Sequence, residues 1–137
     1  MKANSVIRQA METHLQTLDP DFATAWENKD FKPTDAPFQV PTFLFAEPDD
    51  RGFRDSPFTQ RGILTVTLAF PLNEGPGKAE AKAEEVRNYY DRGLSLLTSE
   101  GFSVVVDRTP EITGGEVQEN RYIIRVRIRF YAHIDKA

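Results

Sequence analysis

The sequence predicts an α+β fold: a single mixed, mostly antiparallel β-sheet of about five strands with two main helices packed on it. Apolar residues recur at helical spacing in residues 5–18 and 78–100. They alternate with polar residues in residues 61–70 and 119–133, as strands with one buried face do. The chain of 137 residues is the size of one ordinary domain, so we expect a single domain over residues 1–137.

Residues 5–18 are expected to form the first helix. Asn4 or Ser5 can cap its N-terminus by accepting a backbone N–H bond. Asp19 is followed by Pro20, which ends the helix because the residue before a proline avoids the α region. The apolar stripe of this helix consists of Val6, Ile7, Ala10, Met11, Leu15 and Leu18.

Three strands are expected next, in residues 22–26, 38–46 and 61–70. Pro41 lacks a backbone donor, so the second of these strands should lie at a sheet edge or contain a bulge. Residues 47–60 are charged and rich in turn formers, and we expect them to form a mobile loop.

The second helix is predicted over residues 78–100, after a breaker in residues 71–77. Gly101 is well placed to follow its C-terminus in the left-handed conformation. The inner stripe of this helix consists of Ala79, Ala83, Val86, Tyr90, Leu94 and Leu97.

The chain then returns to strand in residues 102–107 and 119–133, with residues 109–116 as a hairpin-type connection. A strand–helix–strand crossover in this half predicts one pair of parallel strands, with hairpins elsewhere.

The composition indicates a soluble globular domain, with 39% hydrophobic and 28% charged residues. The absence of cysteine excludes disulfides and thiolate metal sites and fits a reducing compartment. A net charge of −4 disfavours sequence-independent DNA binding. We see no signal peptide and no apolar run long enough for a membrane span, so a cytoplasmic protein, or part of an assembly built in the cytoplasm, is expected.

No catalytic constellation is evident in the sequence. His14 and His133 have no nearby cysteine or histidine with which to share a metal. Residues 74–78, EGPGK, lack the spacing and the hydroxyl residue of a phosphate-binding loop. The acids of residues 47–55 do not follow EF-hand spacing, and a solvated acidic loop is the simpler interpretation. We therefore expect no enzyme, no cofactor and no metal.

The last strand carries three arginines on one face, opposite a face of alternating apolar residues. Arg125, Arg127 and Arg129 are same-face neighbours, about 6.5–7 Å apart. Guanidinium groups at this spacing repel one another unless anions pair with them.

Three interpretations of this row remain open: acids on a neighbouring strand of the same sheet, acids of another subunit, or contact with nucleic acid. In the first two cases we expect the pairing acids to come from the acid-rich N-terminal part of the chain. These acids are Asp30, Asp35, Glu47, Asp49, Asp50 and Asp55.

The loop of residues 47–60 is the second candidate surface. Its Phe53 and Phe58 either fold back on the domain or become buried when a partner binds. The candidate subunit or partner interface consists of Arg125, Arg127, Arg129, Asp49, Asp50, Arg51, Phe53, Arg54, Asp55 and Phe58.

Three segments together resemble a known family: AWENKDFKP at residues 25–33, QRGILTVTLAFPLNEGPGKAEAKAEEVRNYY at residues 60–90, and RYIIRVRIRFYAHI at residues 121–134. The chain resembles the tail terminator proteins of long-tailed bacteriophages and prophages, of the lambda-like minor tail protein U type. The matched patterns concern structure rather than chemistry, so no specific contact residues are carried over.

The resemblance implies a non-enzymatic structural subunit of the virion tail, assembled in the bacterial host cytoplasm. It implies a homohexameric ring that caps the tail tube, ends its polymerisation and presents the head-joining surface. The implied partners are other copies of the chain, the tail tube protein and a head-completion or connector protein, with no membrane and no sequence-specific nucleic acid. Two alternatives are a head–tail connector or tail-completion protein of related fold, and a monomeric binding module using residues 121–133.

Overall fold

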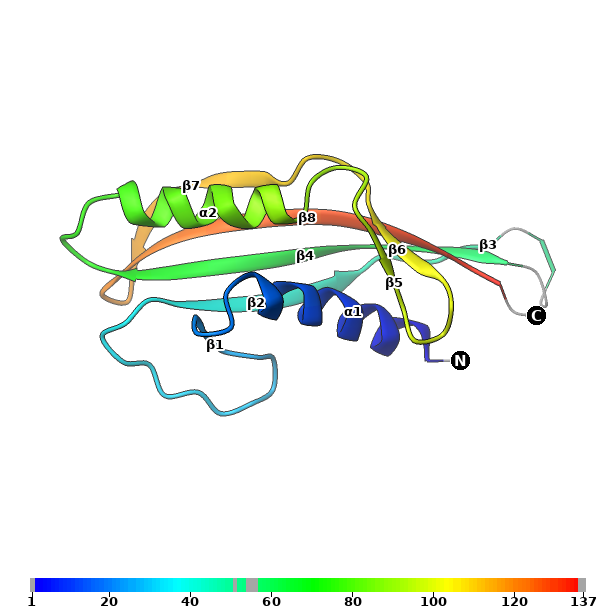
Figure 1. Cartoon of the computed structure of the whole chain (residues 1–137), viewed down its shortest axis with the longest axis horizontal. Helices are drawn as coiled ribbons and strands as arrows, with labels where there is room; N and C mark the ends of the chain where they lie inside the picture. The colour runs from blue at the N-terminus through cyan, green and yellow to red at the C-terminus, as the bar shows by residue number, and fades with distance from the viewer. Residues whose placement is uncertain (1, 51, 54–56, 136–137) are drawn as a thin grey trace.

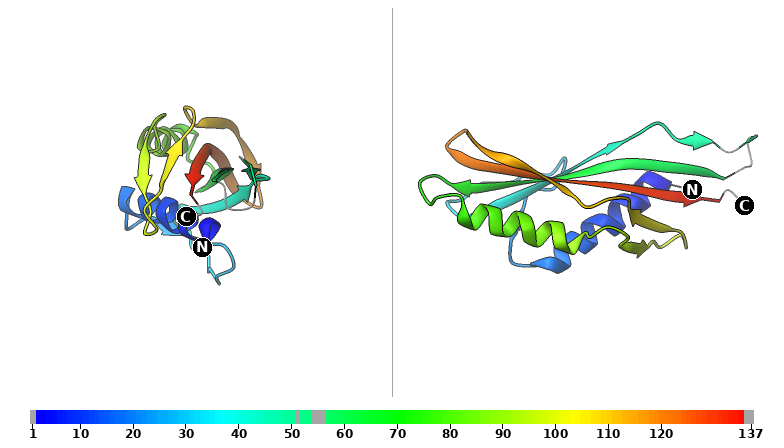
Figure 2. Two further views of the ribbon diagram at one scale, coloured as in Figure 1. Left: turned by 90° about the vertical axis from the view of Figure 1, so that its right-hand side faces the viewer. Right: turned by 90° about the horizontal axis from the view of Figure 1, so that it is seen from above.

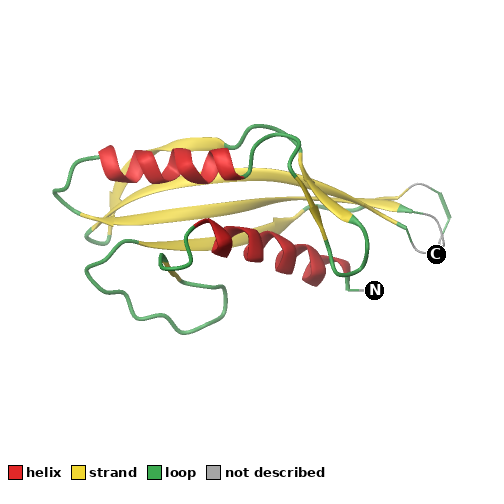
Figure 3. Ribbon diagram, in the orientation of Figure 1, coloured by secondary structure: helices red, strands yellow, loops and turns green. Residues whose placement is uncertain are grey.

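The computed structural model describes residues 2–50, 52–53 and 57–135. Within them the chain forms two helices and eight strands (Figures 1 and 3). The helices are α1 (Ala3–Leu18) and α2 (Gly77–Tyr89). The strands are β1 (Ala23–Thr24), β2 (Phe38–Phe45), β3 (Asp49–Asp50), β4 (Phe58–Pro71), β5 (Ser95–Leu97), β6 (Ser103–Val106), β7 (Glu111–Gln118) and β8 (Arg121–Ile134). The α+β fold class is confirmed.

All eight strands belong to one sheet, ordered β1-β2-β4-β8-β6-β5. Beside this path, β3 pairs with β4 and β7 pairs with β8. The long strands β4 and β8 form its spine and pair antiparallel over their whole length, from Phe58 opposite Ile134 to Pro71 opposite Arg121. Along the middle of both strands buried residues alternate with more exposed ones, so each cross-strand pair there adds buried side chains on one face.

Both helices cover the same face of the sheet (Figure 2). The alternate residues Leu64, Val66 and Leu68 of β4 are fully buried beneath them. On β8 the predicted core positions are also buried, and these are Ile124, Val126, Ile128 and Phe130. The opposite face of the sheet carries no helix, so residues on it can meet other molecules.

Buried polar groups connect the helix layer. The hydroxyl of Tyr90 donates to the carbonyl oxygen of Met11 at 2.7 Å, and burial raises the pKa of this phenol. Nε2 of His14 in α1 donates a hydrogen bond to the carbonyl oxygen of Tyr89 at 2.8 Å. The nearly buried Lys82 of α2 donates to Asp19 at 3.0 Å, at the end of α1. These bonds fix α1 against α2, as expected for buried polar groups that have partners.

The expectation of about five strands was wrong, because short strands and β7 were missed. β7 was predicted as a connection, since its Gly114 and Gly115 lower strand propensity. It forms because the two-residue turn Glu119–Asn120, both with positive φ, folds the chain back onto β8. The register shifts between Thr113 and Glu116, where the two glycines form a bulge.

The predicted second helix was too long, because α2 ends at Tyr89. Gly93 has a φ of +91°, which a continuing helix cannot contain, and its N–H bonds the carbonyl of Val106. Residues 95–97 then pair with β6, so Gly101 lies in a hairpin turn and is not the C-terminal cap of the helix. Leu97 fitted the helical spacing but is 74% exposed.

Two smaller expectations were also wrong. The residue at the N-terminal cap of α1 is Lys2, with no side-chain cap bond from Asn4 or Ser5. The crossover strands β4 and β6 do run parallel, but β8 lies between them, and the parallel pair in the described residues is β1 with β2. Since β1 covers β2 only at Phe38 and Gln39, Pro41 lies at an edge, as predicted.

Candidate subunit interface

The arginine row lies on the face of the sheet that has no helix. Arg125, Arg127 and Arg129 alternate along β8 with buried apolar residues, so their side chains point away from the core. On β4 their direct neighbours are Thr67, Thr65 and Ile63. The predicted placement of the three arginines on one outer face is thus confirmed.

Acids of the neighbouring strand β7 pair with two of the three arginines. Arg125 Nη1 lies 2.7 Å from Glu116 Oε1, and Arg129 Nη1 lies 3.5 Å from Glu111 Oε1. Arg127 is exposed and forms no ion pair within the described residues. Each of the two pairs is partly exposed, so each contributes at most about 1 kcal/mol to stability.

The acids that pair with the arginine row inside the chain were expected in the N-terminal part of the sequence, and this was wrong, because they lie on β7. Among the described N-terminal acids, none pairs with the arginine row, and Asp55 lies outside the described residues. Asp49 instead accepts from Arg61 Nε at 3.4 Å. The acids on β7 were missed because that segment was predicted to be a connection, and only its pairing with β8 brings them beside the arginines.

The second predicted surface lies on the β3–β4 ribbon, which consists of β3 and the start of β4 paired antiparallel, together with the segment that joins them. Asp49 and Asp50 are exposed and pair in register with Thr59 and Phe58. Phe58 is half-buried and packs against the core, whereas Phe53 is 94% exposed. Residues 47–60 were predicted to be a loop throughout, which was wrong, because β3 and the first three residues of β4 lie within them and pair with each other. Arg51, Arg54 and Asp55 lie outside the described residues, and the mobility of the segment stays a prediction.

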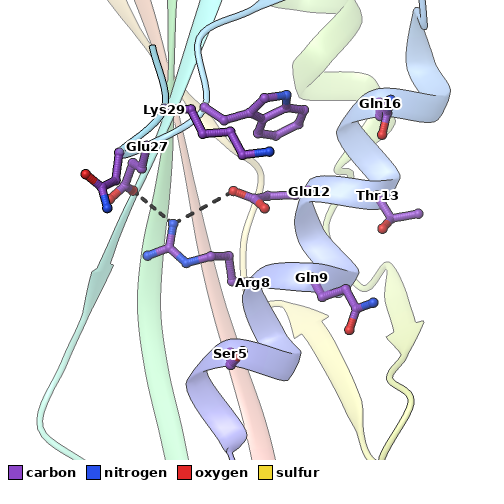
Figure 4. Close-up of a pocket in the computed structure, with 10 residues that line it drawn as sticks. Ser5, Arg8, Gln9, Glu12, Thr13, Gln16, Glu27 and Lys29 are labelled. Carbon is purple, nitrogen blue, oxygen red and sulfur yellow. Dashed lines mark hydrogen bonds and ion pairs between the residues drawn. The ribbon is translucent and has the colours of Figure 1, made fainter.

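A groove beside α1 is a third surface, which the sequence did not indicate (Figure 4). It has a volume of about 760 Å³ and lies between α1 and the turn of residues 26–29. Its charged residues are Arg8 and Glu12 of α1 and Glu27 and Lys29 of the turn, and Trp26 also lines it. The groove exists only because the tertiary fold brings these two segments together.

Arg8 is the centre of the contacts in this groove. Its Nη1 lies 3.1 Å from Glu27 Oε1 but 3.8 Å from Glu12 Oε2, and its guanidinium stacks 4.6 Å from the centre of the Phe43 ring. Glu27 Oε1 also accepts the backbone N–H of Phe43 at 2.8 Å. Burial raises the pKa of Glu12, although Arg8 and Lys29 lower it and Glu27 raises it further. The two carboxylates that line the groove, Glu12 and Glu27, are thus matched in number by two cations, Arg8 and Lys29.

The two histidines contact different parts of the fold. His14 bonds a backbone carbonyl, and Nδ1 of His133 lies 2.8 Å from the hydroxyl of Thr59. Within residues 2–50, 52–53 and 57–135, no group of three His, Asp or Glu side chains is placed to hold a metal ion. In the same residues, neither helix is long and apolar enough to cross a membrane.

A model of the family described as phage tail terminator protein matches residues 6–130. The chain belongs to the phage tail terminator family. The resemblance seen in the sequence is thereby confirmed, because the match covers nearly the whole chain. A search of curated proteins found no match.

A solved structure supports the fold. It aligns with a TM-score of 0.76 at 20% identity, covering 98% of this chain and 97% of the other, and the name of that protein states no function. At this identity the likeness concerns the fold alone.

Family membership gives this tail terminator a structural role in phage tail assembly, as a component of the virion tail that contacts other tail or head-joining proteins. A structural family of this kind implies a non-enzymatic protein.

Proposed function

We propose that this tail terminator forms a homohexameric ring that caps the tail tube, ends tube polymerisation and presents the surface that joins the head. The observation that carries the proposal is the family match over residues 6–130. Its partners would be further copies of the chain, the tail tube protein and a head-completion or connector protein.

The surface of the chain supports an assembly role. One whole face of the sheet is without helices, and it carries both charged and apolar side chains, among them Arg127, Ile63 and the 68% exposed Leu44. Phe53, at the end of the β3–β4 ribbon, exposes a large aromatic ring that a partner can bury. We place the arginine row, Asp49, Asp50 and Phe53 in contacts with other subunits or with the tube.

The monomeric binding module is the less favoured alternative. A nucleic-acid surface needs unneutralised positive charge. Glu116 and Glu111 already pair with Arg125 and Arg129, which leaves Arg127 as the unpaired member of the row within the described residues. The net charge of −4 points the same way.

Imaging of tube ends tests the capping role. Tubes assembled from the cognate tail tube protein are mixed with the labelled terminator and examined by negative-stain electron microscopy. We expect label at one end of each tube, because a cap recognises only the growing end. Label distributed along the tube walls, or no label on tubes at all, would contradict the proposed function.

A further inference from the structure

A cleft without charged side chains lies between α1 and the hairpin in which β5 and β6 pair antiparallel. Its volume is about 340 Å³. Within the described residues, no Asp, Glu, Lys or Arg lines this uncharged cleft, although 28% of the chain is charged. Both walls supply apolar side chains, Val6 and Ala10 from α1 and Leu96 and Leu97 from β5, and Leu97 is 74% exposed. An apolar group from outside the chain therefore suits this cleft better than a charged one.

The main polar groups of the uncharged cleft already have partners inside the chain. Nε2 of His14 donates to the carbonyl oxygen of Tyr89 at 2.8 Å, and the two rings stack with centroids 4.0 Å apart. The hydroxyl of Thr17 donates to the backbone oxygen of His14 at 2.7 Å. The hydroxyl of Thr98 donates to the backbone oxygen of Phe102 at 2.8 Å. An apolar side chain can cover the cleft without breaking these bonds, so its burial does not carry the cost of unmade hydrogen bonds.

Phe53 is the exposed apolar side chain that is best placed to reach another molecule. At 94% it is more exposed than any other large apolar side chain in the described residues. It belongs to the β3–β4 ribbon, which extends past both helices at one end of the molecule (Figures 1 and 2). Leu44 and Val117 are also exposed, but they belong to β2 and β7, which run along the body of the sheet. Burial of an aromatic ring removes about 150–250 Å² from water, so a partner that covers Phe53 gains stability.

The ribbon and the uncharged cleft lie at opposite edges of the sheet. Phe58 and Thr59 pair with β8 on one side and with β3 on the other, so the ribbon lies on the β2 side of β4. β5 is the last strand at the other end of the order β1-β2-β4-β8-β6-β5. Two copies that lie side by side in the same sense therefore bring the ribbon of one copy toward the cleft of the next. Such a heterologous contact produces rings when its rotation closes.

The outer edge of β2 disfavours the alternative, in which neighbouring copies continue one sheet through backbone hydrogen bonds. Pro41 has no N–H to donate, and the N–H of Phe43 is already bonded to Glu27 Oε1 at 2.8 Å. β1 covers the same edge at Phe38 and Gln39. On this side of the molecule, a contact through side chains of the projecting ribbon is thus favoured over strand pairing.

We propose that Phe53 of each subunit enters the uncharged cleft of the next subunit and packs against its Leu97 and the ring of His14. The occupant of the cleft is a second copy of this chain, because the chain itself carries the matching apolar group on the opposite edge. The stacking of His14 on Tyr89 holds one wall in place before binding, which lowers the ordering cost. This inference rests on the proposed ring, and it assigns the ring one specific contact.

Disulfide crosslinking tests the contact, because the chain has no cysteine and an engineered pair reports on one contact alone. A disulfide forms only where two Cα atoms come within about 4.4–6.8 Å of each other. The double variant Phe53→Cys, Leu97→Cys is oxidised both free in solution and on tubes of the cognate tail tube protein. A non-reducing gel should show a ladder of dimer, trimer and larger species that collapses on reduction, because every subunit supplies both halves of the contact.

Controls separate this contact from random collision and from loss of folding. Each single variant can form at most a symmetric dimer. Phe53→Cys combined with Val117→Cys places the second thiol at a similarly exposed apolar position on β7 and should give no ladder beyond the dimer. Phe53→Ala removes only an exposed ring and should weaken association at least about tenfold in native mass spectrometry, whereas Val117→Ala should associate as the wild type does. Circular dichroism confirms the fold of each variant.

Three results would overturn the contact: no ladder from the Phe53→Cys, Leu97→Cys variant either in solution or on tubes, an equal ladder from the variant with Val117→Cys, or unchanged association of Phe53→Ala. Labelling of tube ends by the wild type is a separate readout, so the contact can fail while the capping function stands.

Discussion

Replacement of Gly62 by alanine should destabilise the centre of the sheet. A Cβ atom on Gly62 would lie 2.5 Å from Cζ of Phe130 and 2.7 Å from the backbone oxygen of Leu44. Ordinary carbon contacts begin near 3.5 Å, so about 1 Å of movement is needed. Phe130 is 1% exposed, and the rings of Phe43 and Phe45 pack against it with centroids 6.2 and 6.0 Å away. Neither the ring nor the paired backbone of β2 has space to yield.

Overpacking of this kind costs about 1–3 kcal/mol, and the blocked backbone contact places Gly62→Ala at about 2–3 kcal/mol. Urea unfolding followed by circular dichroism measures the loss. The midpoint should fall by roughly 1–1.5 M at a urea dependence of about 2 kcal/mol per M, the middle of the range of about 1–3 kcal/mol per M for small proteins. The control is Gly77→Ala at the start of α2, where an added Cβ meets nothing within 4 Å and stability should be equal or higher. A Gly62→Ala variant as stable as the wild type would refute the packing described here.

Three further predictions concern polar groups. Tyr90→Phe removes the hydroxyl bonded to Met11 and should cost about 1 kcal/mol in thermal unfolding, whereas a neutral effect would contradict the buried bond. A double-mutant cycle on Arg125 and Glu116 should give a coupling of at most about 1 kcal/mol that shrinks in high salt, and a much larger, salt-insensitive value would argue against a surface pair. Because burial raises the pKa of Glu12, the wild type loses stability as pH rises through that pKa. Glu12→Gln should therefore melt higher than the wild type at pH 7, with the difference vanishing below the ordinary glutamate pKa, and a lower melting temperature at pH 7 would contradict the sign.

The long elements were predictable from the sequence because their patterns are strong. The alternation in residues 61–70 and 119–133 predicted most of β4 and β8 and their buried faces, as in the case of Ile128. The ends differ, because β4 begins at Phe58 and residues 119–120 form the turn before β8. The end of α2 was mispredicted because Leu97 fits the helical spacing although it belongs to β5. Local spacing alone cannot show that Gly93 turns the chain back toward β6.

The interacting surfaces were predictable only in part. The arginine row follows directly from strand periodicity, but its partners on β7 depend on a turn and a bulge that shift the register, so that Glu116 reaches Arg125. The groove around Glu12 could not be foreseen, because it joins α1 to the turn after Trp26 across residues far apart in sequence. Such sites arise from tertiary contact and carry no local pattern.

Tube elongation in the presence of this tail terminator tests the central claim most directly. The cognate tail tube protein is allowed to polymerise with increasing amounts of the terminator, and tube lengths are measured by electron microscopy. Mean tube length should fall as the terminator is added, and capped tubes should not resume growth when more tube protein is supplied. A length distribution that is unchanged at every ratio of the two proteins would contradict it.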